Sequence, residues 1–254
     1  MRLEGQAVVV TGAGRGIGAA MARRFALEGA RVVVNDVDGA AAEEVAAEIG
    51  GHAAPGDAAG AESAARLVAA ATDRLGPIDL FCANAGVAEA GGAEAPDEAW
   101  ARSWEVNVLS HVHAVRALLP AWLDRGAGHF VATVSAAGLL TQIGSAPYAV
   151  TKHAALAFAE WLSVTYGNRG ITVQALCPQG VRTDLLTRAD DRIRALLEPD
   201  ALTPADVAQS VVSGLTDGRF LILPHPEVAR YMVHRATDPD RWLAGMRRMQ
   251  ERLD

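Results

Sequence analysis

Short, continuous apolar segments alternate with amphipathic helical patterns along nearly the whole chain. The first apolar segment runs from Ala7 to Val10, and after a glycine-rich loop Ile17, Met21 and Phe25 recur every four residues. A strand that is apolar on both faces needs helices on both sides, and parallel sheets are built in this way. We therefore predict a doubly wound α/β fold with a seven-stranded parallel sheet and helices on both faces.

Six further segments have the composition of buried strands. They are 31–35, 52–56, 79–83, 129–135, 171–177 and 219–223. A helix is predicted at 98–119 after Asp97, and another at 205–215 after the capping pair Thr203-Pro204.

Two segments between these elements are predicted to be loops or lids. Segment 88–96 is rich in small residues, and segment 182–203 mixes charged residues with leucines. Neither resembles a linker between domains, so we expect one domain over residues 1–254, with a helical tail from about residue 225.

Composition excludes several classes of protein. The net charge of −7 leaves no broad basic surface for nucleic acid. The chain has no charged leader followed by an apolar segment and no run of 18 apolar residues, so we expect a cytoplasmic protein that does not bind membranes. Cys82 and Cys177 lie in apolar runs and are expected to be buried free thiols. No Cys or His cluster has metal-ligand spacing, so no metal is expected.

The loop at positions 11–18 reads TGAGRGIG. Glycines there let the backbone turn sharply and approach a pyrophosphate, whose charge meets the N-terminus of the following helix. The next strand ends at Asp36, 18 residues after Gly18, close to where a carboxylate binds both ribose hydroxyls. This arrangement predicts a Rossmann-type dinucleotide-binding unit. Its cofactor-binding loop residues are Thr11, Gly12, Gly14, Arg15, Gly16, Ile17 and Gly18.

Asp36 favours NAD(H) as the cofactor, with NADP(H) second. A carboxylate would repel the 2′-phosphate of NADP(H), and Arg15 beside the loop is the residue that could soften this repulsion. Without the glycines, Asp36 would read equally well as an exposed acid in a turn.

Tyr148 and Lys152 are four residues apart, and Ser135 precedes Tyr148 by thirteen residues. The four-residue spacing places the phenol and the ammonium on one face of a helix. A nearby ammonium and the positive charge of an oxidised nicotinamide both favour phenolate, so we expect Lys152 and the bound cofactor to bring the pKa of Tyr148 down toward neutral pH. Tyr148 could then act as a general acid/base, with the Ser135 hydroxyl stabilising charge on the substrate oxygen. Taken singly, these residues could be a surface pair and a strand-end cap.

With these motifs the chain resembles a short-chain dehydrogenase/reductase of the single-domain branch. The family's TGxxxGxG motif is matched by Thr11, Gly12, Gly16 and Gly18, its NAG motif by Asn84, Ala85 and Gly86, and its YxxxK motif by Tyr148 and Lys152. The resemblance covers about residues 5 to 185 and implies that the NAG residues border the adenosine half of the cofactor.

The resemblance also implies further roles. Asp57, followed by Ala58, occupies the position that contacts the adenine ring. Asn107 completes a catalytic tetrad with Ser135, Tyr148 and Lys152 and would hold a water in the proton relay. Lys152 would also hydrogen-bond the nicotinamide ribose, so Tyr148 and Lys152 count among the cofactor-binding residues.

The segment CPQGVRTDLL resembles the family's PGxVxT segment, with one departure. The resemblance implies cofactor contacts from Pro178, Gly180, Val181 and Thr183. Gln179 stands where the family usually has glycine. Because Gln adopts positive φ less readily than Gly, this residue either alters the local backbone or projects into the substrate cavity.

The leading hypothesis is an NAD(H)-dependent oxidoreductase that interconverts a secondary alcohol and a ketone, with oxidation as the expected cellular direction. The alternatives are an epimerase or dehydratase of the same family and a dinucleotide-sensing protein without turnover. The predicted substrate residues are Ser135, Gln142, Tyr148 and Gln179. Their surroundings are largely apolar, which favours a hydrophobic or aromatic substrate. No cluster of arginines stands ready for a carboxylate or phosphate.

The resemblance implies a homodimer or homotetramer formed through the helices that carry Asn107 and Tyr148. The C-terminal segment departs from the family's glycine-rich ending. A helix there, carrying Trp242, Leu243, Met246 and Met249, could cover the substrate pocket, dock on another subunit or pack on its own core. We favour packing and a subunit interface.

Overall fold

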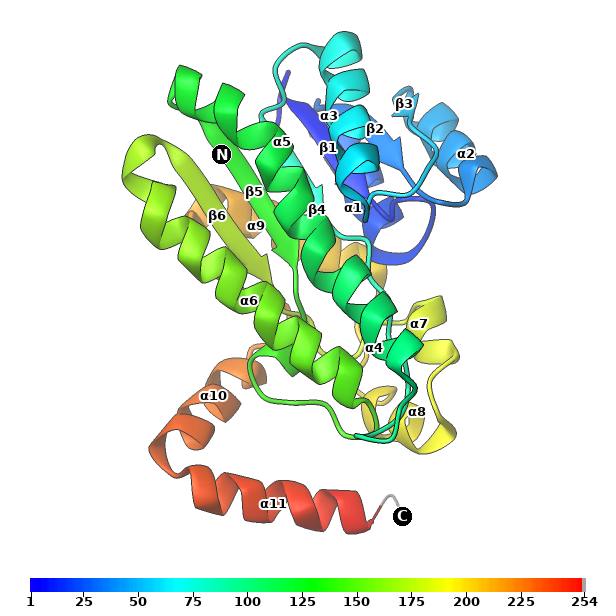
Figure 1. The fold of residues 1–254 in the computed structure, drawn as a ribbon, viewed down its shortest axis with the longest axis vertical. Helices are drawn as coiled ribbons and strands as arrows, with labels where there is room; N and C mark the ends of the chain where they lie inside the picture. The colour runs from blue at the N-terminus through cyan, green and yellow to red at the C-terminus, as the bar shows by residue number, and fades with distance from the viewer. Residues whose placement is uncertain (253–254) are drawn as a thin grey trace.

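The computed structural model describes residues 1–252. Its strands are β1 (Ala7–Thr11), β2 (Arg31–Asn35), β3 (His52–Ala53), β4 (Leu80–Ala83), β5 (Gly128–Thr133), β6 (Ile171–Leu176) and β7 (Leu221–Ile222). They pair in parallel in the order β3-β2-β1-β4-β5-β6-β7 (Figure 1). The predicted seven-stranded parallel sheet is confirmed.

The two edge strands are shorter than predicted. Segment 52–56 contributes only His52 and Ala53 as strand residues, although the backbone N–H groups of Ala54 and Gly56 still donate to the carbonyl oxygens of Val34 and Asp36. Likewise, only Leu221 and Ile222 of segment 219–223 pair with β6.

Helices cover both faces of the sheet (Figure 1). One layer contains α3 (Ala61–Leu75), α5 (Ser110–Arg125) and α6 (Ala146–Tyr166), and the other contains α1 (Gly16–Leu27), α2 (Gly39–Ile49) and α9 (Pro204–Asp217). Each layer packs on its own apolar core. Phe81, Trp122 and Phe130 belong to the first core, and Met21 and Phe25 to the second.

The predicted helix at 98–119 is longer and interrupted. It comprises α4 (Asp97–Trp104), a π-helical segment (Glu105–Leu109) and α5. The helix passes through Pro120 and ends before Gly126, which adopts a positive φ of 65°. Glycine adopts this conformation without the steric penalty of a Cβ, which explains the end of the helix at this residue.

Segment 182–203 is partly helical, which corrects the expectation of a loop. It contains α7 (Asp184–Thr187) and α8 (Asp191–Leu197), and the Asp190 carboxylate caps α8 by accepting a hydrogen bond from the backbone N–H of Arg192. The segment ends at the predicted cap of α9, where Thr203 and Asp206 form a reciprocal capping box.

The C-terminal tail forms α10 (Glu227–Thr237) and α11 (Pro239–Glu251), and Leu253 and Asp254 lie outside the described residues. Helix α10 packs on the core through Val228, whereas no residue of α11 is buried. The expectation that Trp242, Met246 and their neighbours pack in a core is therefore wrong for this helix.

Both cysteines are buried free thiols, as expected. Among residues 1–252, no helix has the length and apolar character needed to cross a bilayer. The same residues contain no group of three or more His, Cys, Asp or Glu side chains placed to hold a metal ion.

His111 on α5 is a buried residue without polar partners. Its side chain is fully buried, its ring packs edge-on against Phe130 at 6.0 Å between centroids, and neither ring nitrogen has a hydrogen-bond partner among the described residues. Burial, with a smaller contribution from the charge of Lys152, lowers the pKa of His111 to about 3. The folded protein therefore holds this ring neutral.

We predict that His111→Leu flattens the dependence of stability on pH. In the unfolded chain the ring titrates near pH 6.5, so its contribution to stability is complete above that pH and is lost as the pH falls toward 3. At pH 5 the wild type should have lost about 2 kcal/mol relative to pH 7, a loss that the variant avoids. Urea unfolding at both pH values measures this difference. His52→Leu, at an exposed position, is the control, and equal losses in wild type and His111→Leu would contradict the prediction.

Candidate functional site

A cavity of about 1450 Å³ lies beyond the carboxyl ends of the strands. Ligands of doubly wound folds bind in this place. Most residues predicted from the sequence line it together: Gly12, Arg15, Gly16, Ile17, Asp36, Asp57, Ala58, Asn84, Ala85, Gly86, Ser135, Gln142, Tyr148, Lys152, Pro178, Gln179, Gly180, Val181 and Thr183. Four predicted residues, Thr11, Gly14, Gly18 and Asn107, lie outside the lining and support it from behind.

Asn84 and Thr11 join the end of β1 to the end of β4. The amide nitrogen of Asn84 donates to the carbonyl oxygens of Thr11 at 3.0 Å and Gly12 at 3.1 Å. The Thr11 hydroxyl accepts hydrogen bonds from the backbone N–H groups of Asn84 and Ala85. These bonds fix the NAG segment against the glycine loop.

The glycine loop has no room for side chains at its central positions. Gly12 and Gly16 adopt positive φ angles of 61° and 57°. A Cβ at Gly18 would lie 2.2 Å from the carbonyl oxygen of Gly12, too close for any side chain. The bare backbone at the start of α1 therefore faces the cavity, as binding of a pyrophosphate requires.

Asp36 ends β2 and is only 6% exposed, yet it lines the cavity. Its carboxylate accepts hydrogen bonds from the backbone N–H of Gly14 at 2.9 Å and of Asp38 at 3.0 Å. A Cβ at Gly14 would lie 3.0 Å from this carboxylate, so glycine is needed for the close approach. The carboxylate is thus fixed in position and keeps lone pairs for ribose hydroxyls.

Arg15 is occupied by acidic partners. Its guanidinium forms ion pairs with Asp38 at 3.1 Å and Asp184 at 3.6 Å. Asp57 lines the adjacent wall, and its carboxylate accepts a hydrogen bond from the backbone N–H of Ala59. The immediate surroundings of the predicted adenosine pocket are therefore more acidic than basic.

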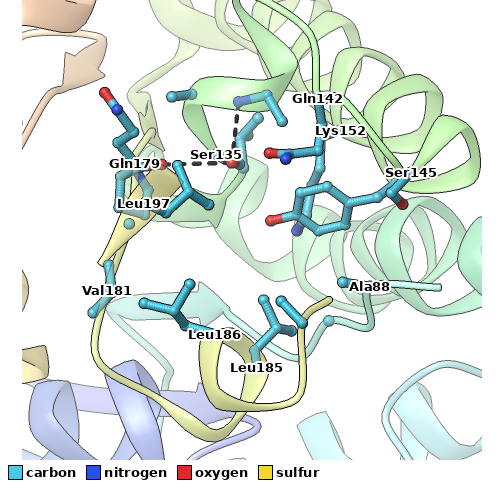
Figure 2. Close-up of a pocket in the computed structure, with 18 of the residues that line it drawn as sticks. Ala88, Ser135, Gln142, Ser145, Lys152, Gln179, Val181, Leu185, Leu186 and Leu197 are labelled. Carbon is cyan, nitrogen blue, oxygen red and sulfur yellow. Dashed lines mark hydrogen bonds between the residues drawn. The ribbon is translucent and has the colours of Figure 1, made fainter. Parts of the chain in front are cut away.

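Ser135, Gln142 and Lys152 lie on one side of the cavity, and Leu185 and Leu186 lie on the opposite side (Figure 2). Ser135 follows β5, and its hydroxyl accepts a hydrogen bond from the backbone N–H of Ala137 at 3.1 Å. Lys152 is only 3% exposed, and its ammonium donates to the carbonyl oxygen of Thr133 at 3.0 Å.

Tyr148 and Lys152 meet one turn apart on α6, as the spacing predicts. The Nζ atom of Lys152 lies 5.5 Å from the centre of the Tyr148 ring. Burial lowers the pKa of Lys152 to about 8, so the amine still carries a charge at neutral pH. Tyr148, Lys152 and Ser135 therefore share one wall of the cavity.

The pKa of Tyr148 depends on burial as well as on nearby charges. Burial raises it above the usual value of 10, and hydrogen bonding with Ser135 opposes this shift without cancelling it. In the protein without a bound cofactor, the loss of water around the phenolate therefore outweighs the groups that favour it, and the expected effect of the nicotinamide charge stays a prediction.

Asn107 does not reach the cavity. It lies in the π-helical segment and is fully buried. Its side-chain oxygen accepts a hydrogen bond from the backbone N–H of Val87, and its nitrogen donates to the Val87 carbonyl and the Thr151 hydroxyl. The side chain therefore ties the segment after β4 to the catalytic helix α6.

Gln179 retains ordinary backbone geometry. Gln179 is not among the residues with positive φ, so the replacement of glycine at position 179 introduces no such strain. The backbone N–H of Gln179 donates to Nδ1 of His225 at 3.2 Å. Figure 2 shows its amide end directed away from the middle of the cavity, which makes Gln142 the more accessible of the two predicted glutamines.

Several lining residues are not among the site residues predicted from the sequence. Thr133 and Ser145 lie beside predicted residues and could have been inferred from proximity in the chain. The tail residues Tyr231, His234, Trp242, Met246 and Met249 also line the cavity, and for the last three this is the alternative of covering the substrate pocket, which the sequence raised but did not favour. No local motif marks them, because their place depends on the direction in which the chain leaves β7.

The lining fits a dinucleotide cofactor. The backbone cradle that Gly18 and its neighbours keep open would receive the pyrophosphate, and the fixed carboxylate of Asp36 would accept the ribose hydroxyls. A volume of about 1450 Å³ exceeds the roughly 300–1,000 Å³ of usual ligand cavities, which leaves space for a second molecule beside the cofactor.

Comparisons with known proteins agree with this geometry. Residues 6–193 match the family model described as short chain dehydrogenase. A 1-deoxy-11-beta-hydroxypentalenate dehydrogenase of Streptomyces exfoliatus is 37% identical, over 89% of this chain and 86% of the relative. A 17-beta-hydroxysteroid dehydrogenase 13 of Rattus norvegicus is 31% identical, over 97% of this chain and 83% of the relative.

A solved structure is also similar. It is a short-chain dehydrogenase/reductase from Burkholderia phymatum in complex with NAD, with a TM-score of 0.87 and 29% identity over 94% of this chain and 96% of that one. Together with the matched family model and the strand order, this places the chain in the short-chain dehydrogenase/reductase family.

Proposed function

We propose that this protein is an NAD(H)-dependent oxidoreductase that interconverts a secondary alcohol and a ketone, with Tyr148 as the acid/base. One observation carries this proposal: Ser135, Tyr148 and Lys152 line the same cavity as the glycine loop and Asp36. A protein that only senses a dinucleotide would have no chemical need for this set. A bound NAD supplies the hydride acceptor.

In alcohol oxidation, Tyr148 takes the proton from the substrate hydroxyl. The Ser135 hydroxyl donates a hydrogen bond to the substrate oxygen and holds it beside Tyr148. Lys152, charged at neutral pH, favours the phenolate. Because burial raises the pKa of Tyr148, we infer that the positive charge of the oxidised nicotinamide is needed to make this tyrosine basic.

The cofactor preference rests on Asp36. Its buried carboxylate would repel a 2′-phosphate at the ribose, and the nearby guanidinium of Arg15 is already paired with Asp38 and Asp184. The similar solved structure binds NAD. These observations favour NAD(H) over NADP(H).

The names of the relatives support a hydrophobic ring alcohol as substrate. Those proteins act on a hydroxypentalenate and a hydroxysteroid, and the cavity here has Leu185 and Leu186 opposite Ser135 (Figure 2). Gln142 would contact a polar group of the substrate, while Gln179 shapes the wall through its backbone.

A homodimer or homotetramer is proposed as the working assembly. Helices α4 and α6 pack together and expose Trp104, Trp161 and Val164, the last at 85% exposure. Large apolar side chains exposed on neighbouring helices are typical of a subunit interface.

We expect Tyr148→Phe to lower kcat for alcohol oxidation by about 10²–10⁴-fold, because the ring remains but no longer exchanges a proton. Formation of NADH from NAD and a panel of secondary alcohols measures this. Tyr166→Phe, on the same helix but outside the cavity lining, is the matched control. Full activity of Tyr148→Phe would contradict the proposed mechanism.

Alcohol oxidation should become faster as the pH rises. The reaction needs deprotonated Tyr148, and burial shifts the pKa of this group upward, so the active fraction grows with pH through the neutral range. We expect kcat/KM for oxidation to increase about tenfold per pH unit on the acidic side of this pKa. If kcat/KM for oxidation stays constant between about pH 6 and pH 8, Tyr148 is not the base.

Asp36→Asn should weaken discrimination against NADP by about tenfold or more, because it removes the charge but keeps the size of the side chain. The ratio of the dissociation constants of NADP and NAD, measured by titration calorimetry, reports this change. Asp217→Asn removes the same charge from an exposed site outside the lining and serves as the control. An unchanged ratio in Asp36→Asn would assign the cofactor preference to other residues.

A further inference from the structure

The α10–α11 arm is fixed to the two segments that carry the proposed catalytic residues. Helix α10 is anchored by buried Val228 and by Arg235, whose guanidinium donates to the carbonyl oxygen of Leu139. The same guanidinium lies 3.4 Å from Nε2 of His153. Leu139 follows the turn after Ser135, and His153 follows Lys152 on α6, so the arm has a defined position relative to the reacting groups.

Helix α11 lies apart from the α/β body (Figure 1). It has no buried residue, but one of its faces lines the cavity, formed by Arg241, Trp242, Gly245, Met246, Arg248 and Met249. The rings of Trp242 and Tyr231 lie 6.3 Å apart, and both belong to the lining. An apolar face that meets a cavity continuous with the catalytic wall is suited to a ligand rather than to a core.

Five arginines line the cavity, and they differ in their partners. Arg15, Arg102 and Arg188 pair with carboxylates of Asp38, Glu89 and Asp184. Within residues 1–252, the guanidiniums of Arg241 and Arg248 have no ion pair and no hydrogen bond. The two free cations are therefore both on α11.

Gly245 lies beside the guanidinium of Arg248, the second of these two arginines. An Nη atom of Arg248 lies 3.7 Å from the position that a Cβ at Gly245 would occupy. The guanidinium of Arg248 therefore lies close to Gly245, and both residues line the cavity. A methyl group there would be in ordinary van der Waals contact with the guanidinium, so space does not require glycine, and its cost of roughly 0.5–1 kcal/mol relative to alanine has no structural explanation.

We propose that the substrate is an amphipathic alcohol: its apolar ring body packs against Trp242 and Met246, and a carboxylate distant from the reacting alcohol binds Arg241 and Arg248. This inference rests on the proposed function and names its substrate class. Arg241 and Arg248 lie seven positions apart on α11, about two helical turns, and both line the cavity. Guanidinium groups bind carboxylates through directed, charge-assisted hydrogen bonds.

The test compares three alcohols with NAD and the full-length protein. Lithocholic acid supplies a secondary ring alcohol and a distant carboxylate, its methyl ester removes only the charge, and cyclohexanol removes the large apolar body. Both epimers at the alcohol carbon of the two steroids are included. We expect the wild type to oxidise the acid with a higher kcat/KM than the ester, mainly through a lower KM.

Two pairs of variants separate charge from apolar contact. In the double variant Arg241→Gln/Arg248→Gln, the acid-to-ester ratio of kcat/KM should fall about tenfold, whereas Arg247→Gln, outside the lining, should leave it unchanged. In Trp242→Ala/Met246→Ala, both steroids should lose at least about tenfold relative to cyclohexanol. Leu243→Ala, half exposed and outside the lining, is its control.

The outcomes are distinguishable. Equal kcat/KM values of the wild type for acid and ester, or the same ratio in the Arg241/Arg248 and Arg247 variants, would overturn the carboxylate site. Oxidation of cyclohexanol without oxidation of either steroid would overturn the substrate class and leave the proposed function standing. If NAD binds and none of the three alcohols is oxidised, the proposed function itself fails.

Discussion

The close contact between the glycine loop and the end of β4 is the constraint on which the site depends. Asn84 hydrogen-bonds the carbonyl oxygens of Thr11 and Gly12, and Gly18 packs against Gly12 with no space for a Cβ. The first strand, the loop and the first helix are therefore fixed relative to the fourth strand. Because the next strand, β5, carries Ser135 at its end, the same contact determines how far the proposed cofactor cradle lies from the proposed catalytic wall.

Burial sets the chemistry of that wall. Lys152 is buried and Tyr148 is partly buried, and the loss of surrounding water favours the neutral form of each: it lowers the pKa of the amine and raises that of the phenol. A mobile, solvated lysine would keep its charge more easily but would interact more weakly with the tyrosine, because water screens the attraction. The fold thus holds both groups in a poorly hydrated place, where the positive charge of an oxidised nicotinamide would have its largest effect on the pKa of Tyr148.

The sequence predicted what depends on local patterns. Apolar segments located the strands, and the four-residue spacing of Tyr148 and Lys152 predicted their meeting on one helix face. The same patterns placed Asp36 beside the glycine loop, where the structure shows it hydrogen-bonded to Gly14.

What depends on distant parts of the chain could not be predicted in this way. Trp242 looked like a core residue because an apolar stripe on a helix does not reveal what faces it. Nothing in the sequence around Asn107 indicates that its side-chain amide forms hydrogen bonds with Val87 and Thr151. The direction of the Tyr148 pKa shift also required the burial of the ring, which spacing alone does not give.

The π-helical segment between α4 and α5 limits the insertions and deletions that this helix can accommodate. A π turn holds one residue more than an α turn, and here it contains Asn107. Deleting one residue would restore a regular helix and rotate everything before it by about 100°. Trp104 would then leave the exposed surface beside α6, and Asn107 would lose its register with Val87. Length variation in this helix is therefore restricted by geometry on both sides, and insertions are better accommodated in the segment before Asp97.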